Sequence, residues 1–192
     1  MINVLQIKAE IESITPKIWR RFLVKDNITF DKLHETIQIV MGWSNYHLYS
    51  FYTDNEQIGI SNKFIENESN SKKIKLKDKL SLKQKFNYTY DFGDTWEHVL
   101  IVEKILDNNN SYLFPTCISG KRAGPPEDCG GYNGYYRLME IKKNKKHPEY
   151  NDMIKEWLGE DFDFEHFNVE EINKELIKLQ KVDGRKRYWV QK

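Results

Sequence analysis

The sequence predicts an α+β fold: a β-grasp-like mixed sheet with one helix packed across it, followed by C-terminal helices. Three observations predict this fold. Two N-terminal stretches alternate apolar and polar residues, as half-buried strands do. A third stretch places apolar residues at helical spacing, and a second alternating pair, rich in aromatic residues, follows it. The last third of the chain then returns to helical spacing.

The N-terminal alternation is clearest over Leu5–Glu12, and Pro16 interrupts it. Ile18–Lys25 predicts a second strand, so we expect an antiparallel hairpin. On this second strand Arg20 and Arg21 lie on opposite faces among large apolar residues, and a buried arginine requires a partner. One arginine could cover the sheet edge while the other pairs with a loop carboxylate. Alternatively, one of them enters a pocket and binds an anion or an acidic partner.

The first helix is predicted over Phe30–Met41, where apolar residues recur at helical intervals. Thr29 suits an N-cap, and Gly42 suits the left-handed residue that commonly follows a helix. A short aromatic stretch, His47–Thr53, predicts the next strand. The polar segment 55–79 then predicts a long exposed loop.

A second hairpin is predicted from Lys85–Phe92 and Trp96–Ile105, the clearest alternating stretches of the chain. A three-residue loop, Gly93–Thr95, would pair Phe92 with Trp96. The aromatic residues of both strands would then share one face. A two-residue loop would mix those aromatic residues with acidic ones, so we expect the odd-numbered loop.

The register of this hairpin decides which polar groups can act together. With the odd loop, His98 lies beside Tyr90 on the aromatic face. Asp91 and Glu97 share the opposite face, and Asp94 lies at the tip. These groups are candidates for metal binding or acid–base chemistry. Because the register separates His98 from the carboxylates, a hydrogen-bonded core histidine and a turn aspartate are the simpler interpretation.

The segment 112–134 is predicted to be a loop, because cysteine, glycine and proline interrupt it throughout. Its glycines follow Glu127 and Asp128 and precede a helix, which is the setting of a phosphate-binding loop. Their spacing fits neither the dinucleotide fingerprint nor the P-loop. A tight turn that lets Tyr132 pack closely is the simpler interpretation.

Cys117 and Cys129 are the only cysteines of the chain, so no disulfide framework is expected. Zinc sites usually combine closely spaced pairs of ligands. Two cysteines supply half of the ligands of such a site. His98 or His47 could supply the others only if the fold brings them close to the cysteines. We therefore predict no cofactor and keep Cys117, Cys129 and His98 as the candidates for a metal ion.

The C-terminal part, 135–183, predicts three helices. The first follows the glycine- and proline-rich loop directly. The second begins near His147 and ends at Gly159, and the third begins at Asn168. Asn168 and Glu171 have the spacing of a capping box.

The chain is predicted to be a single domain over residues 1–192. It comprises a sheet-and-helix core at 1–106, the loop at 112–134, the helical part and a basic tail at 184–192. The tail interleaves basic and aromatic residues, which suits contact with nucleic acid, although a solvated terminus is the simpler interpretation. Its clustered basic residues are Arg185, Lys186 and Arg187.

The net charge and the hydropathy of the chain limit the classes of function that we expect. The 30 basic and 29 acidic residues give a net charge of +1, so the whole molecule has no general attraction to nucleic acid or to membranes. No apolar run approaches the roughly 20 residues that cross a bilayer, and the first residues alternate instead of forming a signal segment. We expect a cytoplasmic protein without membrane contact.

Short motifs along most of the chain identify a relationship. In order they are Ile18-Trp19-Arg20-Arg21, Leu33-His34, Met41-Gly42-Trp43, Tyr46-His47-Leu48, Tyr88 to His98, and Pro125 to Tyr135. This pattern resembles the plasmid pRiA4b ORF-3-like family, which also occurs as a passenger protein of insertion elements. The resemblance implies an α+β fold and an association with plasmids and mobile elements, but no agreed reaction. Gly124 stands where relatives often carry a cysteine, which weakens a thiol-based role for the loop.

Two classes of function remain open. The first is a non-catalytic binding or accessory protein, which uses an aromatic and acidic cleft where the second hairpin meets the loop, for an unknown protein or small ligand. We expect Arg20 or Arg21 to donate hydrogen bonds to the acidic pair of the loop. The second is a metal-dependent hydrolase of phosphoesters or nucleic acid, which is less favoured because the sequence shows no dense set of convergent ligands. The candidate binding residues are Arg20, Arg21, Tyr90, Asp91, Asp94, Trp96, Glu97, His98, Glu127, Asp128 and Tyr132.

Overall fold

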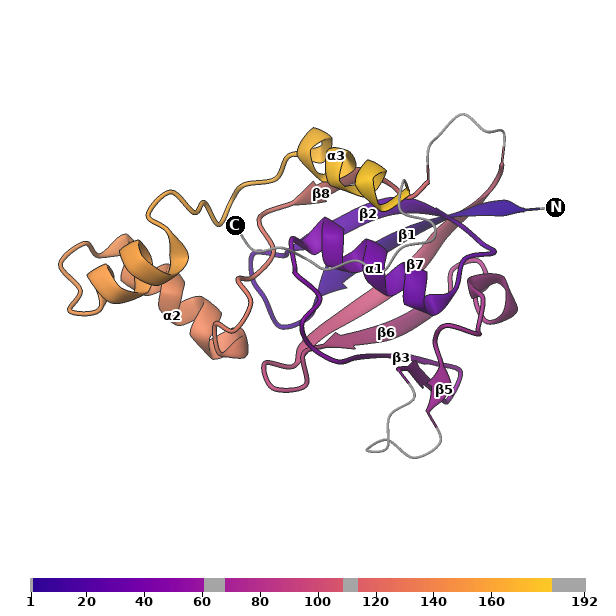
Figure 1. Cartoon of the computed structure of the whole chain (residues 1–192), viewed down its shortest axis with the longest axis horizontal. Coiled ribbons are helices and arrows are strands. Elements are labelled where there is room, and N and C mark those ends of the chain that lie inside the picture. Colours follow the sequence, from indigo (N-terminus) through magenta and orange to yellow (C-terminus); the bar gives the residue numbers. More distant parts are fainter. Residues whose placement is uncertain (1, 61–67, 109–113, 181–192) are drawn as a thin grey trace.

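The computed structural model describes residues 2–60, 68–108 and 114–180. The fold is α+β, as predicted, with one eight-stranded mixed sheet and helices on one side and at one end of it (Figure 1). The strands follow the spatial order β5-β4-β3-β6-β7-β1-β2-β8. In chain order the elements are β1 (Asn3–Ile11), β2 (Trp19–Lys25), α1 (Phe30–Met41), β3 (Tyr49–Thr53), β4 (Glu56–Gly59), β5 (Ser69–Asn70), η1 (Leu76–Asp78), β6 (Lys85–Tyr90), β7 (Trp96–Asp107), β8 (Thr116–Lys121), α2 (Gly131–Lys143), η2 (Tyr150–Leu158) and α3 (Val169–Gln180).

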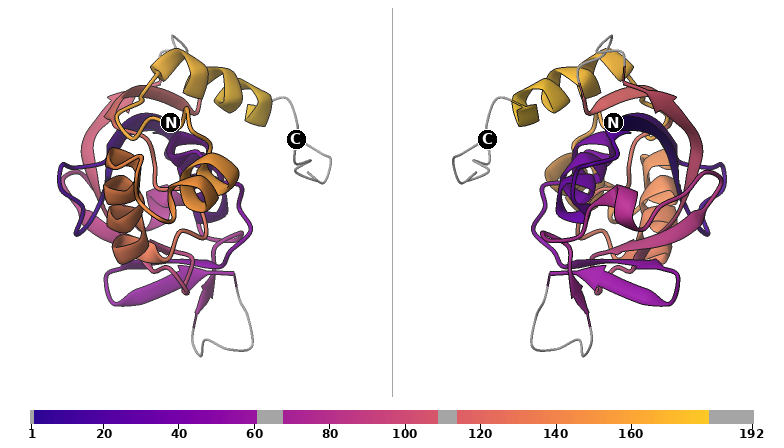
Figure 2. Two further views of the ribbon diagram at one scale, coloured as in Figure 1. Left: turned by 90° about the vertical axis from the view of Figure 1, so that its left-hand side faces the viewer. Right: turned by 90° about the vertical axis from the view of Figure 1, so that its right-hand side faces the viewer.

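The N-terminal hairpin and the first helix form as predicted. β1 pairs antiparallel with β2, and it also pairs antiparallel with β7 on its other side. The Thr29 hydroxyl caps α1 by accepting a hydrogen bond from the Lys32 N–H, and Gly42 ends the helix with φ of 86°. α1 packs on the inner face of the sheet, where Phe30 meets Phe51 edge-on at 5.2 Å. The sheet curves around this helix (Figure 2).

The second hairpin has the predicted faces but a longer turn. Tyr90, not Phe92, pairs with Trp96, so the turn has five residues instead of three. Both turn lengths are odd, which is why the aromatic residues still share one face. Phe92 falls in the turn and is 42% exposed. His98 consequently lies opposite Tyr88 and not beside Tyr90.

The described parts of the segment 55–79 contain two strands that its polar composition does not predict. β4 and β5 lie within it and pair in parallel, which makes the sheet mixed. Asp54 and Asn55 both have positive φ, at 48° and 63°, so they form a tight turn that folds β4 back onto β3. The buried Ile58 anchors β4 to the core.

The predicted loop 112–134 contains a strand that the sequence did not reveal. β8 pairs antiparallel with β2 and forms one edge of the sheet. Asn173 of α3 both accepts from the Cys117 N–H (2.8 Å) and donates to the Cys117 carbonyl (2.9 Å). These two bonds cover backbone groups that an edge strand would otherwise expose.

The C-terminal helices form with two differences from the prediction. α2 begins at Gly131, within the predicted loop, and the second helix, η2, is a π-helix. Gly159 follows the end of η2, as predicted. Asn168 caps α3 by accepting from the Glu171 N–H and donating to the Glu171 carboxylate at 3.0 Å. The basic tail at 184–192 lies outside the described residues. Within the described ranges, no helix is long and apolar enough to cross a membrane.

Candidate functional site

The second hairpin and the glycine-rich loop meet in space, as predicted. The Gly130 N–H donates to the Asp94 carboxylate (3.1 Å), and the Glu97 N–H donates to the Tyr132 hydroxyl (3.0 Å). Tyr132 also packs edge-on against Trp96, with ring centroids 5.2 Å apart. A Cβ at Gly131 would lie 2.6 Å from the Asp94 carbonyl oxygen. This glycine therefore permits close packing, which supports the tight turn over a phosphate-binding loop.

Glu127 ties the loop to the core by a different contact from the one predicted. Its carboxylate accepts from the Tyr90 hydroxyl (2.5 Å) and from the Ser44 N–H (2.8 Å). The Trp43 indole adds a hydrogen bond to the Pro125 carbonyl oxygen (2.9 Å). Burial, and then the hydrogen bond to Glu127, raise the pKa of Tyr90, so its hydroxyl stays protonated and can donate. Tyrosine and backbone donors thus take the place of the expected arginines.

Arg20 and Arg21 lie on opposite faces of β2, as predicted, and neither bonds to the acidic pair of the loop. Arg21 forms a bidentate pair with Glu103 on the outer face (2.6 and 2.8 Å), which raises the pKa of Arg21 and lowers that of Glu103. Arg20 faces inward and is only 3% exposed. Its guanidinium donates to the backbone carbonyl oxygens of Trp19, Val40 and Lys121.

The aromatic residues predicted to wall a cleft are core residues. Tyr88, Tyr90 and Trp96 are each at most 1% exposed, and Trp43 stacks on Tyr90 at a centroid distance of 4.8 Å. Their ring faces therefore contact one another and no solvent. Of this predicted set, only Tyr132 keeps part of its surface exposed.

His98 belongs to the same core. It is fully buried, and its Nδ1 donates to the Trp96 carbonyl oxygen at 2.9 Å. Burial lowers the pKa of His98 to about 4, so the ring is neutral at physiological pH. The interpretation of His98 as a hydrogen-bonded core histidine agrees with this geometry. Asp91 and Glu97 do not share a face, because Asp91 leaves the strand for the turn.

A second buried histidine supports the loop between α1 and β3. His34 Nε2 donates to the Asn45 side-chain oxygen (2.7 Å), and His34 Nδ1 accepts from the Tyr88 hydroxyl (2.8 Å). Burial lowers the pKa of His34 to about 3. The Tyr46 N–H donates to the Tyr90 hydroxyl (3.2 Å). These bonds fix the residues that precede His47.

Three polar side chains converge where this loop, the hairpin turn and the glycine-rich loop come together. His47, Asp91 and Asp128 each offer one ligand atom, and these atoms lie within 4.8 Å of one another. Among the described residues they form the one group of three such side chains that could hold a metal ion. We call it the His47 cluster. Asp91 is 7% exposed, whereas the Asp128 side chain is 70% exposed, so the cluster opens to solvent on one side.

Within the His47 cluster, both ring nitrogens of the histidine lie within ion-pairing distance of an aspartate. His47 Nε2 lies 3.0 Å from an Asp128 oxygen, yet it forms no hydrogen bond with any described residue and is shielded from solvent. His47 Nδ1 lies 3.7 Å from an Asp91 oxygen. Asp91 and Asp128 both have positive φ, at 56° and 57°, which aspartate tolerates better than most residues. Asp91 is further held by the Gly93 N–H at 2.9 Å.

The sequence placed Asp91 and Asp128 among the candidates but left His47 out of the binding set. The sequence predicts a strand over His47–Thr53, whereas β3 begins only at Tyr49. The signal that pointed to it is its place in the motif Tyr46-His47-Leu48. Nothing in the order of the chain shows that three separate loops meet at this point.

The cysteines do not join a metal site among the described residues. Cys117 lies on β8 and Cys129 in the loop, and neither belongs to the His47 cluster. Burial raises the pKa of Cys117 to about 11 and that of Cys129 to about 12. Both thiols are therefore protonated at neutral pH, which does not suit a nucleophile.

Comparison with known proteins identifies the family. The model of the plasmid pRiA4b ORF-3-like protein family matches residues 3–171, so the chain belongs to this family. It is 30% identical to the uncharacterized protein y4hQ of Sinorhizobium fredii, with 92% of each chain covered. It is also similar to the crystal structure of MM3350, a protein of unknown function from Methanosarcina mazei Go1. That structure is 41% identical, with a TM-score of 0.83, over 89% of this chain and 98% of the other.

Proposed function

We propose that this member of the plasmid pRiA4b ORF-3-like family is a non-catalytic binding module that holds a divalent cation in the His47 cluster. The observation that supports the proposal most is the convergence of one imidazole and two carboxylates from three loops. Nitrogen and oxygen ligands of this kind suit zinc, manganese and iron(II) ions. Cysteine takes no part, so the proposal replaces the expectation that Cys117, Cys129 and His98 are the metal candidates.

The electrostatics of the cluster give the physical reason. Asp91 is largely buried, and a buried carboxylate is stable only when paired. His47 Nε2 is shielded from solvent and lies 3.0 Å from an Asp128 oxygen without forming a hydrogen bond to it, and a cation could bind both atoms. The supporting contacts resemble those that orient metal ligands in general: the Gly93 N–H holds Asp91, and Glu127 holds the loop that carries Asp128.

Isothermal titration calorimetry with MnCl2 and ZnCl2 tests the proposal. We expect saturable binding of one ion per chain. His47→Gln, Asp91→Asn and Asp128→Asn should each weaken it by at least about tenfold, since even residues that only orient ligands commonly contribute that much. His147→Gln is the matched control, because His147 is a surface histidine 4.0 Å from Glu149. Equal affinities in all variants would refute the proposed site.

A metal-dependent hydrolase of phosphoesters is the second candidate. The observation in its favour is that three protein ligands leave coordination positions open, as in catalytic zinc sites, and that the Asp128 side is exposed. The test is hydrolysis of bis(p-nitrophenyl) phosphate by the manganese-loaded protein. The binding proposal predicts no turnover above that of manganese alone. Turnover that is abolished by Asp91→Asn would favour the hydrolase over the non-catalytic binding module.

The second part of the proposal concerns the cellular context of the protein. The family description names a plasmid, and on that basis we place the protein as an accessory of plasmids or mobile elements. A cation held at the exposed junction of three loops would let a protein or a small ligand complete its coordination. Cross-linking of the tagged protein in cells that carry a plasmid, compared between the wild type and Asp128→Asn, would show whether capture of a partner depends on the cluster.

A further inference from the structure

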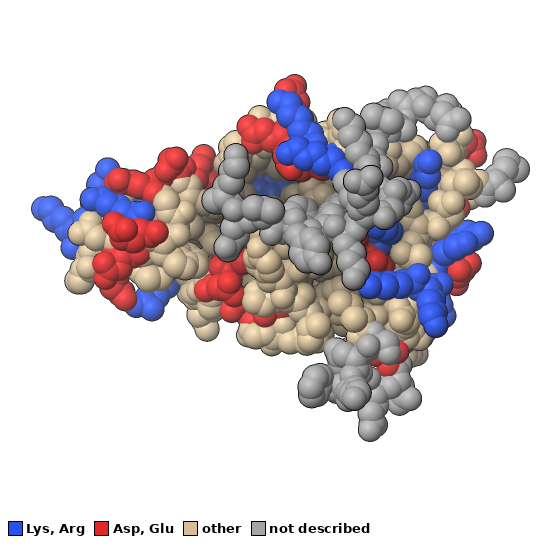
Figure 3. Space-filling model, in the orientation of Figure 1, with Lys and Arg blue, Asp and Glu red and all other residues tan. Residues whose placement is uncertain are grey.

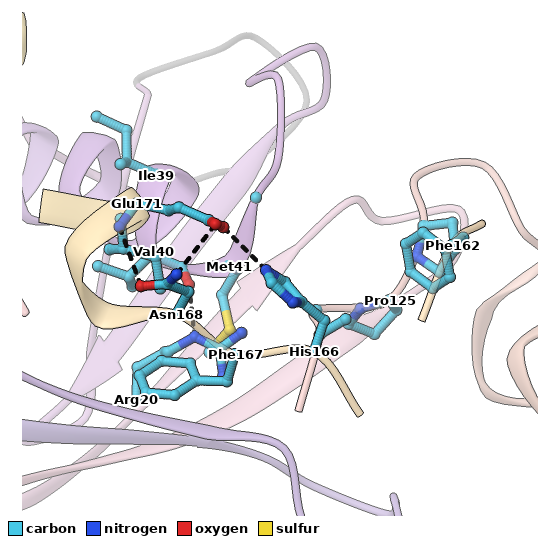
Figure 4. A pocket seen from close by; sticks show the side chains of 15 residues that line it. Arg20, Ile39, Val40, Met41, Pro125, Phe162, His166, Phe167, Asn168 and Glu171 are labelled. Atoms are coloured by element: carbon cyan, nitrogen blue, oxygen red, sulfur yellow. Dashed lines mark hydrogen bonds and ion pairs between the residues drawn. The ribbon is translucent and has the colours of Figure 1, made fainter. Parts of the chain in front are cut away.

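A cavity of about 220 Å³ lies between the end of α1, residues 123–126, and the start of α3 (Figure 4). We call it the Arg20 cavity, because the Arg20 side chain forms part of its wall. Most of the lining is apolar. The apolar side chains that matter below are Met41, Phe162 and Phe167. At about 30 Å³ per water molecule in the liquid, the volume corresponds to about seven waters, which suits a small organic molecule.

Arg20 carries a charge that no described residue neutralises. None of the described carboxylates lies within ion-pairing distance of its guanidinium, and its Nε and Nη1 donate only to backbone carbonyl oxygens. Nη2 donates to none of the described residues, and it is not fully enclosed by protein. Nη2 is therefore the donor that remains available on the cavity side.

The neighbouring partner of Arg20 is an aromatic ring and not an anion. The guanidinium carbon lies 4.9 Å from the centre of the Phe167 ring, and the two side chains lie together in Figure 4. A cation–π contact stabilises the charge only in part. Burial lowers the pKa of Arg20 to about 10, which reflects the same unfavourable desolvation. A bound anion would remove this imbalance.

Two other polar features of the cavity wall do not supply the anion site. Asn168 already accepts from the N–H groups of Glu170 and Glu171, so the first turn of α3 has little donor capacity left. The Glu171 carboxylate is bound by His166 (2.9 Å) and by Asn168, as Figure 4 shows. Because it adds negative charge to the wall, it disfavours a dianion such as phosphate more than a monoanion.

We propose that the Arg20 cavity binds a small organic monocarboxylate. Its carboxylate accepts from the Arg20 guanidinium, and its apolar body lies against Met41, Phe162 and Phe167. Arginine suits this role because its guanidinium remains charged and its Nη2 still offers N–H donors, while Nε and Nη1 are held by backbone carbonyl oxygens. The cavity is distinct from the His47 cluster, so the inference stands independently of the cation proposal.

The test compares benzoate with benzamide, which has the same shape without the charge. Each is titrated into the wild-type protein in EDTA and followed by two-dimensional amide NMR; EDTA prevents benzoate from binding through a metal ion. We expect benzoate to shift signals of β2 and α3 saturably and to bind at least about tenfold more tightly than benzamide, while inorganic phosphate binds more weakly than benzoate. Equal binding of benzoate and benzamide, no binding of either, or tighter binding of phosphate would each overturn the proposal.

Substitutions at Arg20 and Arg21 show whether the preference for benzoate arises in the Arg20 cavity. Arg20→Gln should remove the preference for benzoate over benzamide. Arg21→Gln is the matched control, because Arg21 is the next residue on β2 but faces the other side of the sheet and pairs with Glu103. If Arg20→Gln does not fold, the comparison of the three ligands on the wild-type protein still decides the question. A preference for benzoate that Arg20→Gln leaves intact would assign the anion site elsewhere and overturn the proposal.

Discussion

Two histidines lie on either side of the same aromatic cluster and have opposite surroundings. His98 packs against Tyr88 with ring centroids 5.2 Å apart and is fully buried. Its Nδ1 lies near the carbonyl oxygens of Tyr88 and Trp96, and its Nε2 has no hydrogen-bond partner among the described residues. His47 packs edge-on against Tyr90 at 5.8 Å, but its side chain is 28% exposed and approaches two aspartates. The same ring is therefore a neutral core residue in one place and a candidate cation ligand in the other.

This comparison separates the hairpin into two regions with different roles. The aromatic face of β6 and β7 stabilises the fold, and the turn between these strands presents Asp91 to the His47 cluster. The face of the molecule in Figure 3 shows acidic and basic side chains interspersed, in agreement with the net charge of +1. Substitutions in the aromatic face should reduce stability, and substitutions in the cluster should reduce binding.

The largest expected effect is on the aromatic face. Trp96→Ala should lower the free energy of unfolding by about 3–5 kcal/mol, because Trp96 is 1% exposed and its removal leaves a cavity in the core. Phe92→Ala is the matched control, since Phe92 is 42% exposed, and it should change stability by less than about 0.5 kcal/mol. Urea denaturation measures both. A loss below about 1 kcal/mol for Trp96→Ala would show that the aromatic face is not part of the core.

The second effect is a pH dependence that comes from the buried histidines. The pKa values of His98 and His34 are lowered to about 4 and about 3, whereas an unfolded histidine titrates near 6.5. Below pH 6.5 the unfolded chain binds protons that the folded protein does not, so stability is fully present above pH 6.5 and is lost as the pH falls. Each histidine should lower stability by about 2 kcal/mol between pH 6.5 and pH 5. Glu103 titrates below this window, because Arg21 lowers its pKa from 4.5.

Urea denaturation at pH 7 and pH 5 checks this dependence. His98→Phe should have a shallower pH dependence than the wild type, and the surface variant His147→Gln should have the same dependence as the wild type. A wild-type protein whose stability is equal at the two pH values would contradict the assignment of neutral, buried histidines.

A smaller effect is expected where the two regions are joined. Tyr90→Phe removes the hydroxyl that donates to Glu127 and accepts from the Tyr46 N–H, so it should lower stability by about 1–3 kcal/mol. It should also weaken cation binding by about tenfold, because Glu127 then keeps only its bond to the Ser44 N–H and holds the loop less firmly. Calorimetry and denaturation on the same variant test both parts. Weaker folding with unchanged cation affinity would show that the loop is positioned without this bond.

The smallest change in stability is expected in the cluster itself. Asp128→Asn should change the free energy of unfolding by less than about 0.5 kcal/mol in EDTA, because the Asp128 side chain is 70% exposed. With manganese present, the wild type should melt at a higher temperature than the variant, since an ion that binds only the folded state stabilises it. Equal melting temperatures of the two proteins in excess manganese would contradict a role for Asp128 in binding.

Much of the fold follows from local patterns in the sequence. The N-terminal alternation predicts β1 and β2, and Thr29 and Gly42 mark the ends of α1 correctly. β4 and β8 are different, because both are short and carry few apolar residues, so pairing with neighbouring strands and not their own pattern makes them strands. The turn after Tyr90 shows a related limit: the aromatic face fixes whether the loop is odd, but three and five residues satisfy it equally.

The candidate site was predictable only in part. The motifs identified Asp91, Glu127 and Asp128, and they correctly indicated that the hairpin and the loop meet. The partners of these residues depend on which loop lies next to which, and a single sequence does not contain that information. The predicted aromatic cleft failed for a related reason: large aromatic side chains build cores as readily as binding surfaces, and only packing separates the two.

The central claim is that His47 binds a cation and His98 does not. The most direct measurement is the nitrogen NMR spectrum of protein labelled in its histidine rings, recorded before and after one equivalent of ZnCl2 and again after EDTA. We predict that a ring nitrogen signal of His47 moves on addition of zinc and returns with EDTA, that the His98 signals stay unchanged, and that Asp91→Asn abolishes the shift. A His47 signal that does not respond to zinc would contradict the claim, and so would an identical shift in Asp91→Asn.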